Sequence, residues 1–147
     1  MKFRSLYICD DVRYELGGKF SAMGLFPPAI AVGGFPARLR AALLLEVTYE
    51  QAGEQTYQVR GIVEETDEPL FEFDVQTNSK VKGQTDFQPL EGLELTFDEK
   101  STLVIQAKSD GGRWRKLRTL SVSVGPWMAS PSEPPQLETQ SHGDAPD

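Results

Sequence analysis

Apolar residues recur at every second position through most of this chain. The clearest stretch is residues 38–50, where one predicted face carries Leu39, Ala41, Leu43, Leu45, Val47 and Tyr49. A period of two is that of a β-strand. The other face begins with Arg38 and Arg40 and is interrupted by Ala42 and Leu44. The segment ARLRAALLLE also has high helix propensity, but the alternation and the β-branched Val47-Thr48 favour a long strand.

The same alternation predicts half-buried strands at residues 71–75, 93–97, 103–107 and 120–124. Turn residues separate these runs, among them Gly17-Gly18, Ala52-Gly53-Glu54, Asp67-Glu68-Pro69 and Asp110-Gly111-Gly112. No segment predicts a long helix. We therefore expect an all-β fold: an antiparallel, immunoglobulin-like β-sandwich of about eight strands, with a closed barrel as the alternative.

Two segments lack this alternation. Residues 78–89 are polar, which predicts an exposed loop and a place where binding residues could lie. Residues 127–147 are rich in Pro, Ser and acidic side chains and poor in large apolar ones. Such a segment buries too little surface to offset its ordering entropy. We expect a domain at residues 1–126 and a disordered acidic tail at 127–147.

Charge and composition narrow the functional classes. The net charge is −7, and four carboxylates without any Lys or Arg lie in residues 127–147, so the remainder carries −3. A nucleic-acid partner is therefore not expected, because that affinity needs a basic excess. No apolar run is long enough for a membrane span or a signal peptide. With the single Cys9, these features predict a cytoplasmic protein.

The acidic step Cys9-Asp10-Asp11 is the first candidate for chemistry. Asp10, Asp11 and Glu15 together supply oxygen ligands of the kind that divalent cations prefer. The alternative is structural, since Asp at a strand end often accepts backbone hydrogen bonds and Arg13 is close enough to form an ion pair. We keep the three carboxylates as a candidate metal or small-ligand site.

Catalytic chemistry has little support in the sequence. Cys9 has no base beside it, because the only histidine, His142, lies in the predicted tail. Free cysteines commonly pack as small apolar residues, so we predict a buried thiol. The chain has no serine-nucleophile elbow and no phosphate-binding loop. We expect a protein that is not an enzyme and needs no cofactor.

The run RWRKLR is the sharpest surface candidate. On a regular strand, Arg113, Arg115 and Leu117 would project to one side, and Trp114, Lys116 and Arg118 to the other. Trp and Arg are frequent interface anchors. Arg113, Trp114, Arg115 and Arg118 are therefore predicted to contact another protein with an acidic surface. The alternative is that these cations only protect an exposed sheet edge from unwanted pairing.

The pattern CDDVRYELGGKFSAMGLF, followed by Phe35-Pro36, resembles an uncharacterised bacterial family of small β-sandwich proteins. The specific part of the likeness covers residues 2–36. This resemblance implies a β-sandwich and a bacterial origin, and it implies no catalytic residues. Together with the basic hairpin, it favours a non-enzymatic interaction or accessory module of a bacterial cytoplasmic system. The alternative function is the binding of a divalent metal or small ligand by Asp10, Asp11 and Glu15.

Overall fold

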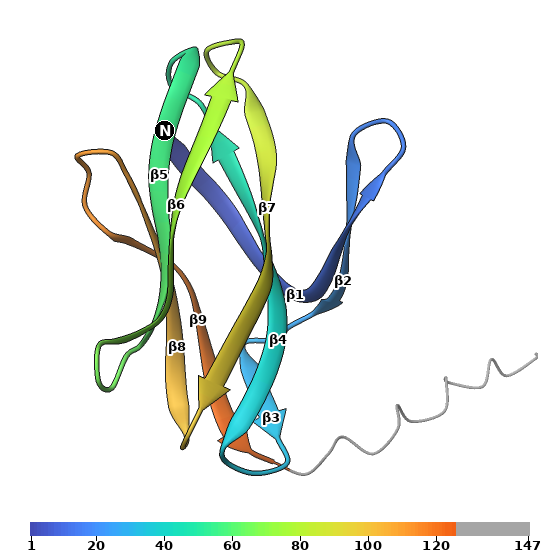
Figure 1. Ribbon diagram of the computed structural model, residues 1–147, viewed down its shortest axis with the longest axis vertical. Coiled ribbons are helices and arrows are strands. Elements are labelled where there is room, and N and C mark those ends of the chain that lie inside the picture. Colours follow the sequence, from blue (N-terminus) through green and yellow to red (C-terminus); the bar gives the residue numbers. More distant parts are fainter. Residues whose placement is uncertain (126–147) are drawn as a thin grey trace, which may run out of the picture.

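The computed structural model describes residues 1–125 and confirms the all-β prediction (Figure 1). The predicted tail at 127–147 lies outside the described residues. Residues 1–125 contain nine strands, where the sequence predicts about eight. They are β1 (Lys2–Glu15), β2 (Lys19–Leu25), β3 (Ala29–Val32), β4 (Ala37–Thr48), β5 (Gly53–Val63), β6 (Glu68–Ser79), β7 (Thr85–Phe97), β8 (Ser101–Ser109) and β9 (Arg115–Val124).

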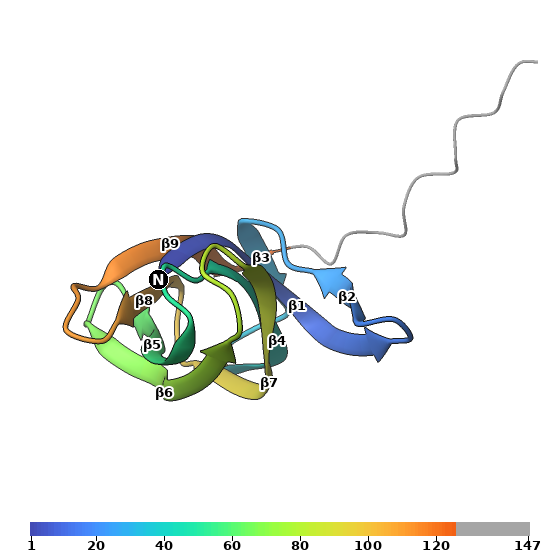
Figure 2. The ribbon, with the colours of Figure 1, turned by 90° about the horizontal axis from the view of Figure 1, so that it is seen from above.

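The strands form two separate sheets, as a sandwich requires, and not one closed sheet. One sheet has the order β2-β1-β4-β7 and the other the order β3-β9-β8-β5-β6. Neighbouring strands are antiparallel except β3 and β9, which are parallel. Figure 2 shows the two layers from above, with β2 and β3 towards one side and β6 and β7 towards the other. The described residues include no helix of the length and apolar character that a membrane crossing needs.

The main core fills the space between the sheets. Both sheets contribute fully buried side chains, among them Leu43 and Leu45 of β4, Leu103 and Ile105 of β8 and Leu120 of β9. The alternating apolar face predicted for residues 38–50 packs in this main core. The predicted strand is therefore confirmed, and the competing helix is excluded. Burial of these side chains is the main favourable term in the stability of the sandwich.

A second, smaller cluster lies on the outer face of the four-stranded sheet. Ala42 and Leu44 point away from the main core, yet both are buried. Their neighbours are Cys9 and Val12 of β1 and Phe20 and Ala22 of β2. The two apolar interruptions on the polar face of β4 are therefore explained by a local cover that β1 and β2 provide.

Residues 10–25 extend beyond the sheet as a two-stranded arm. β1 pairs with β4 only as far as Cys9, and after that residue it pairs with β2 alone. The turn between them has Gly17 and Gly18 at φ angles of 83° and 73°, a region that suits glycine. Figure 1 shows β1 descending through the sheet and then turning into this arm, which stands apart from the sandwich.

The prediction of an exposed loop at residues 78–89 is wrong. β6 continues to Ser79 and β7 begins at Thr85, so only residues 80–84 connect them. The alternation of polar and apolar residues is not visible at the start of β7, because polar side chains stand there at positions paired with buried residues of β4. Gln88 is paired with Leu45, and its amide donates to the Tyr49 hydroxyl at 3.1 Å. The Tyr49 hydroxyl also bonds Thr77 Oγ1 at 2.6 Å, which links the two sheets.

Candidate binding surface at the start of strand β9

The three predicted metal ligands lie along the arm without forming a cluster. Asp11 pairs with Arg13, whose Nε lies 3.3 Å from Asp11 Oδ2. Glu15 accepts a hydrogen bond from Ser21. The Asp10 side chain instead lies against Gly24. Nowhere in residues 1–125 do three His, Cys, Asp or Glu side chains come together in a group that could hold a metal ion. The geometry gives the metal hypothesis no support.

Cys9 is fully buried, as predicted, at the base of the arm. Its thiol lies 3.4 Å from the Asp11 carbonyl oxygen and 3.7 Å from that of Ala42, and it can donate to these acceptors. Burial raises the pKa of the Cys9 thiol, and the nearby Asp10 and Asp11 carboxylates act in the same direction. Because the thiolate is the nucleophilic form, this environment disfavours nucleophilic chemistry at Cys9.

The predicted basic hairpin has a different arrangement from a regular strand. Arg113 and Trp114 precede β9, and a register shift lies between Ile105 and Gln106 of β8. Lys116 pairs with Gln106, whereas Arg118 pairs with the buried Ile105. Leu117 is the extra residue of this bulge and packs against the main core. The prediction that Arg118 shares a side with Trp114 and Lys116 is therefore wrong, because a bulge breaks the alternation.

Trp114 is held by two cations from other strands. The Arg60 guanidinium carbon lies 4.2 Å from the centroid of the Trp114 ring, and Lys108 Nζ lies 4.5 Å from it. Both distances are within the range of cation–π attraction. Arg60 Nε also donates to Gln106 Oε1 at 2.9 Å, which fixes its position over the ring. The half-buried Trp114 thus forms the centre of a preformed positive surface.

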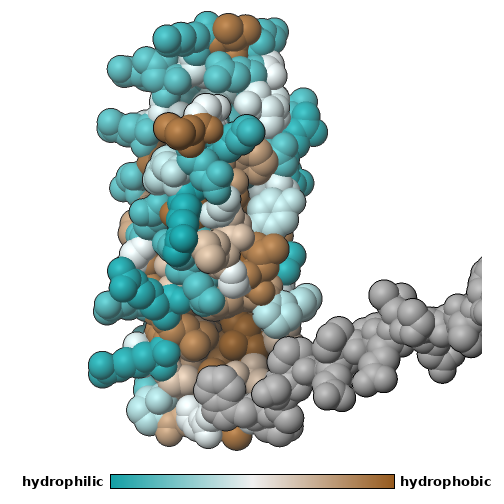
Figure 3. Space-filling view, turned by 90° about the vertical axis from the view of Figure 1, so that its right-hand side faces the viewer, coloured by the Kyte–Doolittle hydropathy of each residue, from teal (hydrophilic) through white to brown (hydrophobic). Residues whose placement is uncertain are grey.

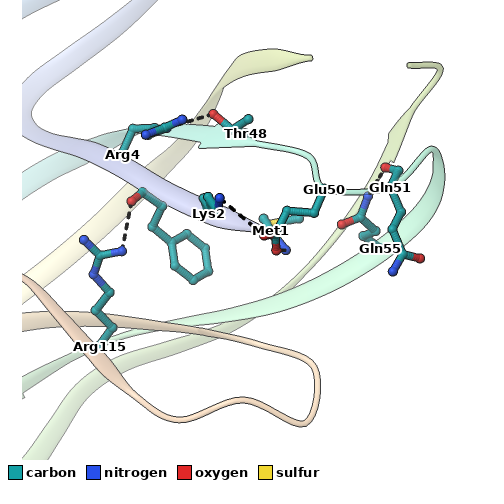
Figure 4. A network of polar contacts seen from close by, with 9 residues as sticks. Met1, Lys2, Arg4, Thr48, Glu50, Gln51, Gln55 and Arg115 are labelled. Carbon is teal, nitrogen blue, oxygen red and sulfur yellow. Dashed lines mark hydrogen bonds and ion pairs between the residues drawn. The ribbon is translucent and has the colours of Figure 1, made fainter. Parts of the chain in front are cut away.

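Arg115 reaches across to the first strand. Its Nη1 donates to the Phe3 carbonyl oxygen at 3.3 Å (Figure 4). The start of β1 is fixed in turn by the Met1 amino group, which lies 2.6 Å from a Glu50 carboxylate oxygen. These ion-pair and hydrogen-bond interactions lower the pKa of Glu50. Arg115 is therefore positioned beside β1 but remains exposed.

Among the basic residues at the start of β9, Arg118 has a buried nitrogen atom without a hydrogen-bond partner within residues 1–125. Its Nε is buried and has no hydrogen-bond partner among the described residues. Buried donors are normally paired, so this one marks a place where an acceptor would be stabilising. Lys116 differs, because its Nζ lies 2.8 Å from Glu64 Oε1. Within residues 1–125, Arg113, Arg115 and Arg118 form no ion pair with a carboxylate.

We call this surface the basic corner. Its members share a location at the start of β9 and a positive or aromatic character: they are Arg60, Lys108, Arg113, Trp114, Arg115, Lys116 and Arg118. Arg60 was missed because it lies more than fifty residues before the RWRKLR run, and Lys108 was missed because it belongs to the preceding strand, β8. Their only signal is that each stands at a polar position of an alternating strand. The edge-protection alternative stays open for residues 115–120, since β3 covers only the later part of β9.

Neither the comparison with protein-family models nor the comparison with curated proteins finds a match for this chain. The resemblance of residues 2–36 to a bacterial family therefore stays a prediction.

Proposed function

We propose that this protein is a non-enzymatic interaction module that binds an acidic segment of another protein at the basic corner. The observation that carries the proposal is that Arg115 and Arg118, three residues apart on β9, form no ion pair within residues 1–125, and that Arg118 Nε also has no hydrogen-bond partner there. A carboxylate of the partner would meet the terminal nitrogens of these two guanidinium groups, because the buried Nε is closed to an outside molecule. Arg is well suited to this role because its planar group can bind a carboxylate through two parallel hydrogen bonds.

The aromatic centre of the corner supports the same proposal. Trp114 offers a large, rigid contact surface at little cost in side-chain entropy, and Arg60 and Lys108 already orient it. The surrounding cations provide electrostatic steering of an acidic partner, which raises the association rate. Since Lys116 is already paired with Glu64, we assign the main contacts to Arg113, Trp114, Arg115 and Arg118.

The test is a charge reversal with a matched control. Arg113→Glu with Arg115→Glu changes two exposed cations of the basic corner, and Arg38→Glu with Arg40→Glu makes the same change on the outer face of β4. Binding is measured by calorimetry with a polyglutamate peptide and by co-purification of partners from the native host. We expect the corner variant to lose at least about tenfold in affinity. The control variant should keep most of its affinity.

Circular dichroism and thermal unfolding would verify that both variants are folded. Equal losses in the two variants would show that only overall charge matters. No binding of the peptide at physiological salt, together with unchanged partner recovery by the corner variant, would remove the basic corner from any account of function.

A further inference from the structure

The longest uncharged stretch among the described residues forms one side of the sandwich. No Asp, Glu, Lys or Arg occurs in residues 20–37. This stretch supplies nearly all of β2 and the whole of β3, the edge strands of the two sheets. Natural edge strands usually carry charges or prolines that prevent pairing with another chain. β2 has Lys19 at its first position and no other charge.

The outer edge of β2 is open to pairing. Within the described part of the chain, β2 pairs only with β1. Its backbone groups on the other side are therefore available to another strand, as in any sheet edge. The arm is also only two strands wide beyond Cys9, and such hairpins are marginally stable until something covers them.

Exposed apolar side chains concentrate on the same arm. Of the nine large hydrophobic residues that are exposed among the described residues, four lie on the arm: Tyr14, Leu16, Met23 and Leu25. Met23 and Leu25 belong to β2 itself and are 43% and 57% exposed. Figure 3 faces the side of the molecule where the arm lies, and its hydrophobic side chains gather in the lower part of that face, mostly below the arm and towards β3 of Figure 1. Clustered exposure of this kind marks interaction surfaces.

The charges at the two ends of β2 favour a second copy of this chain as the partner. Lys19 lies at the tip end of the arm, opposite Glu15. At the other end, Met23 is paired with Asp11, and Gly24 lies against the Asp10 side chain. Two β2 strands running antiparallel would bring each Lys19 towards the Asp10 and Asp11 end of the other copy. A parallel arrangement would place the two lysines side by side, which is unfavourable.

We propose that β2 pairs antiparallel with β2 of a second copy of this chain. The two four-stranded sheets then form one continuous sheet across a two-fold axis, and the end of β2 that carries Met23 and Leu25 lies beside the Lys19 end of the other copy. Such an interface is isologous, because the same patch of each copy meets itself. It lies on a different strand and sheet from the basic corner, and it does not depend on the proposed function.

The test is the oligomeric state of the full chain, measured by sedimentation equilibrium over a range of concentrations. We expect the wild type to be a dimer and Met23→Lys to raise the dissociation constant at least about tenfold, since it places a charge on the pairing edge. Val81→Lys is the matched control, because Val81 is 61% exposed in the connection between β6 and β7. The control should leave the dissociation constant unchanged.

Lys19→Glu supplies a second variant that tests the charge contact and leaves Met23 in place. It brings a carboxylate towards Asp10 and Asp11 of the other copy, so the dimer should weaken and added salt should partly restore it. A wild type that stays monomeric at millimolar concentration would overturn the proposal. A dimer that Met23→Lys and Val81→Lys affect equally would also overturn it.

Discussion

The edge strands on the two sides of the sandwich differ in the charges that they carry. On one side, β6 carries Glu68, Glu72 and Asp74 and no cation, and on the same side β7 carries three carboxylates. On the other side, β2 and β3 carry only Lys19. Carboxylates along an edge repel a second copy of the same edge, whereas an uncharged edge accepts one. Of the two sides, only that of β2 and β3 is suited to self-association.

The two sides also differ in what holds their edge strands. β6 packs on the main core through Leu70, Phe71 and Val75. β2 contacts only the small outer cluster, through Phe20 and Ala22. An edge strand with few buried contacts opens at a lower free-energy cost than one anchored in the core. The arm is therefore the part of the described fold that gains most from a covering partner.

Truncating one aromatic side chain of β6 and one of β2 should give the largest difference in the free energy of unfolding. Phe71 packs on the main core and stacks on Phe73, whereas Phe20 contacts the outer cluster and the edge of the Tyr14 ring. We expect Phe71→Ala to lower the free energy of unfolding by about 3 kcal/mol and Phe20→Ala by about 1 kcal/mol. Urea denaturation monitored by circular dichroism measures both. Equal losses would contradict the weaker anchoring of β2.

Substitution of one glycine in β2 and one in β7 should give the next largest difference in the free energy of unfolding. Gly24 of β2 and Gly92 of β7 have φ angles of 66° and 76°, where any other residue is strained. At Gly92 a Cβ atom would meet nothing, but at Gly24 it would collide with the Asp10 side chain. We expect Gly92→Ala to cost about 1 kcal/mol and Gly24→Ala about 2 kcal/mol in denaturant unfolding.

A second substitution, at Asp10, tests whether the extra cost of Gly24→Ala comes from the collision with the Asp10 side chain. Asp10→Ala should remove the two closest contacts and leave only the Asp10 Cβ atom at 3.1 Å, so the cost of Gly24→Ala in that background should fall towards the value found for Gly92→Ala. A cost that stays the same when Asp10 is shortened would mean that backbone strain alone accounts for the effect.

The sequence predicted most of this framework because its strands alternate in hydrophobicity, and the exceptions have identifiable causes. The polar residues of early β7 were assigned to a loop because Gln88 pairs with a buried position of β4 and is satisfied by Tyr49. No local pattern reports such a bond between residues far apart in sequence. For the same reason, the small cluster behind Ala42 and Leu44 was not foreseen.

The candidate site could be predicted only in part. The run RWRKLR located the basic corner, but the bulge at Leu117 changed the side that Arg118 occupies. A bulge depends on pairing with β8, so single-strand periodicity cannot reveal it. The contacts of Trp114 with Arg60 and Lys108 likewise depend on the order of β5, β8 and β9, which alternation does not encode.

Hydrogen exchange would compare the two edges directly. At low protein concentration, we expect the amides of β2 to exchange at least about tenfold faster than those of β6, because local opening of the arm breaks few buried contacts. Raising the concentration should slow exchange in β2 and leave β6 unchanged if β2 pairs with a second copy. Exchange is measured by mass spectrometry on proteolytic fragments. Equal slowing of both edges would point to non-specific association.

Cys9 provides the smallest but most local probe, because its thiol is buried where the arm meets the sheet. If the arm opens on its own, Phe20→Ala should speed iodoacetamide labelling of Cys9 severalfold, whereas Phe71→Ala should have less effect despite its greater cost to global stability. If labelling requires global unfolding, this order is reversed.

The pH dependence of Cys9 labelling gives a further check. Burial raises the pKa of the Cys9 thiol above that of a free cysteine, so less thiolate is present at neutral pH. Labelling of the native protein should therefore keep rising to a higher pH than labelling of a free cysteine, and a plateau at the same pH as the free cysteine would mean that the reacting thiol is already exposed.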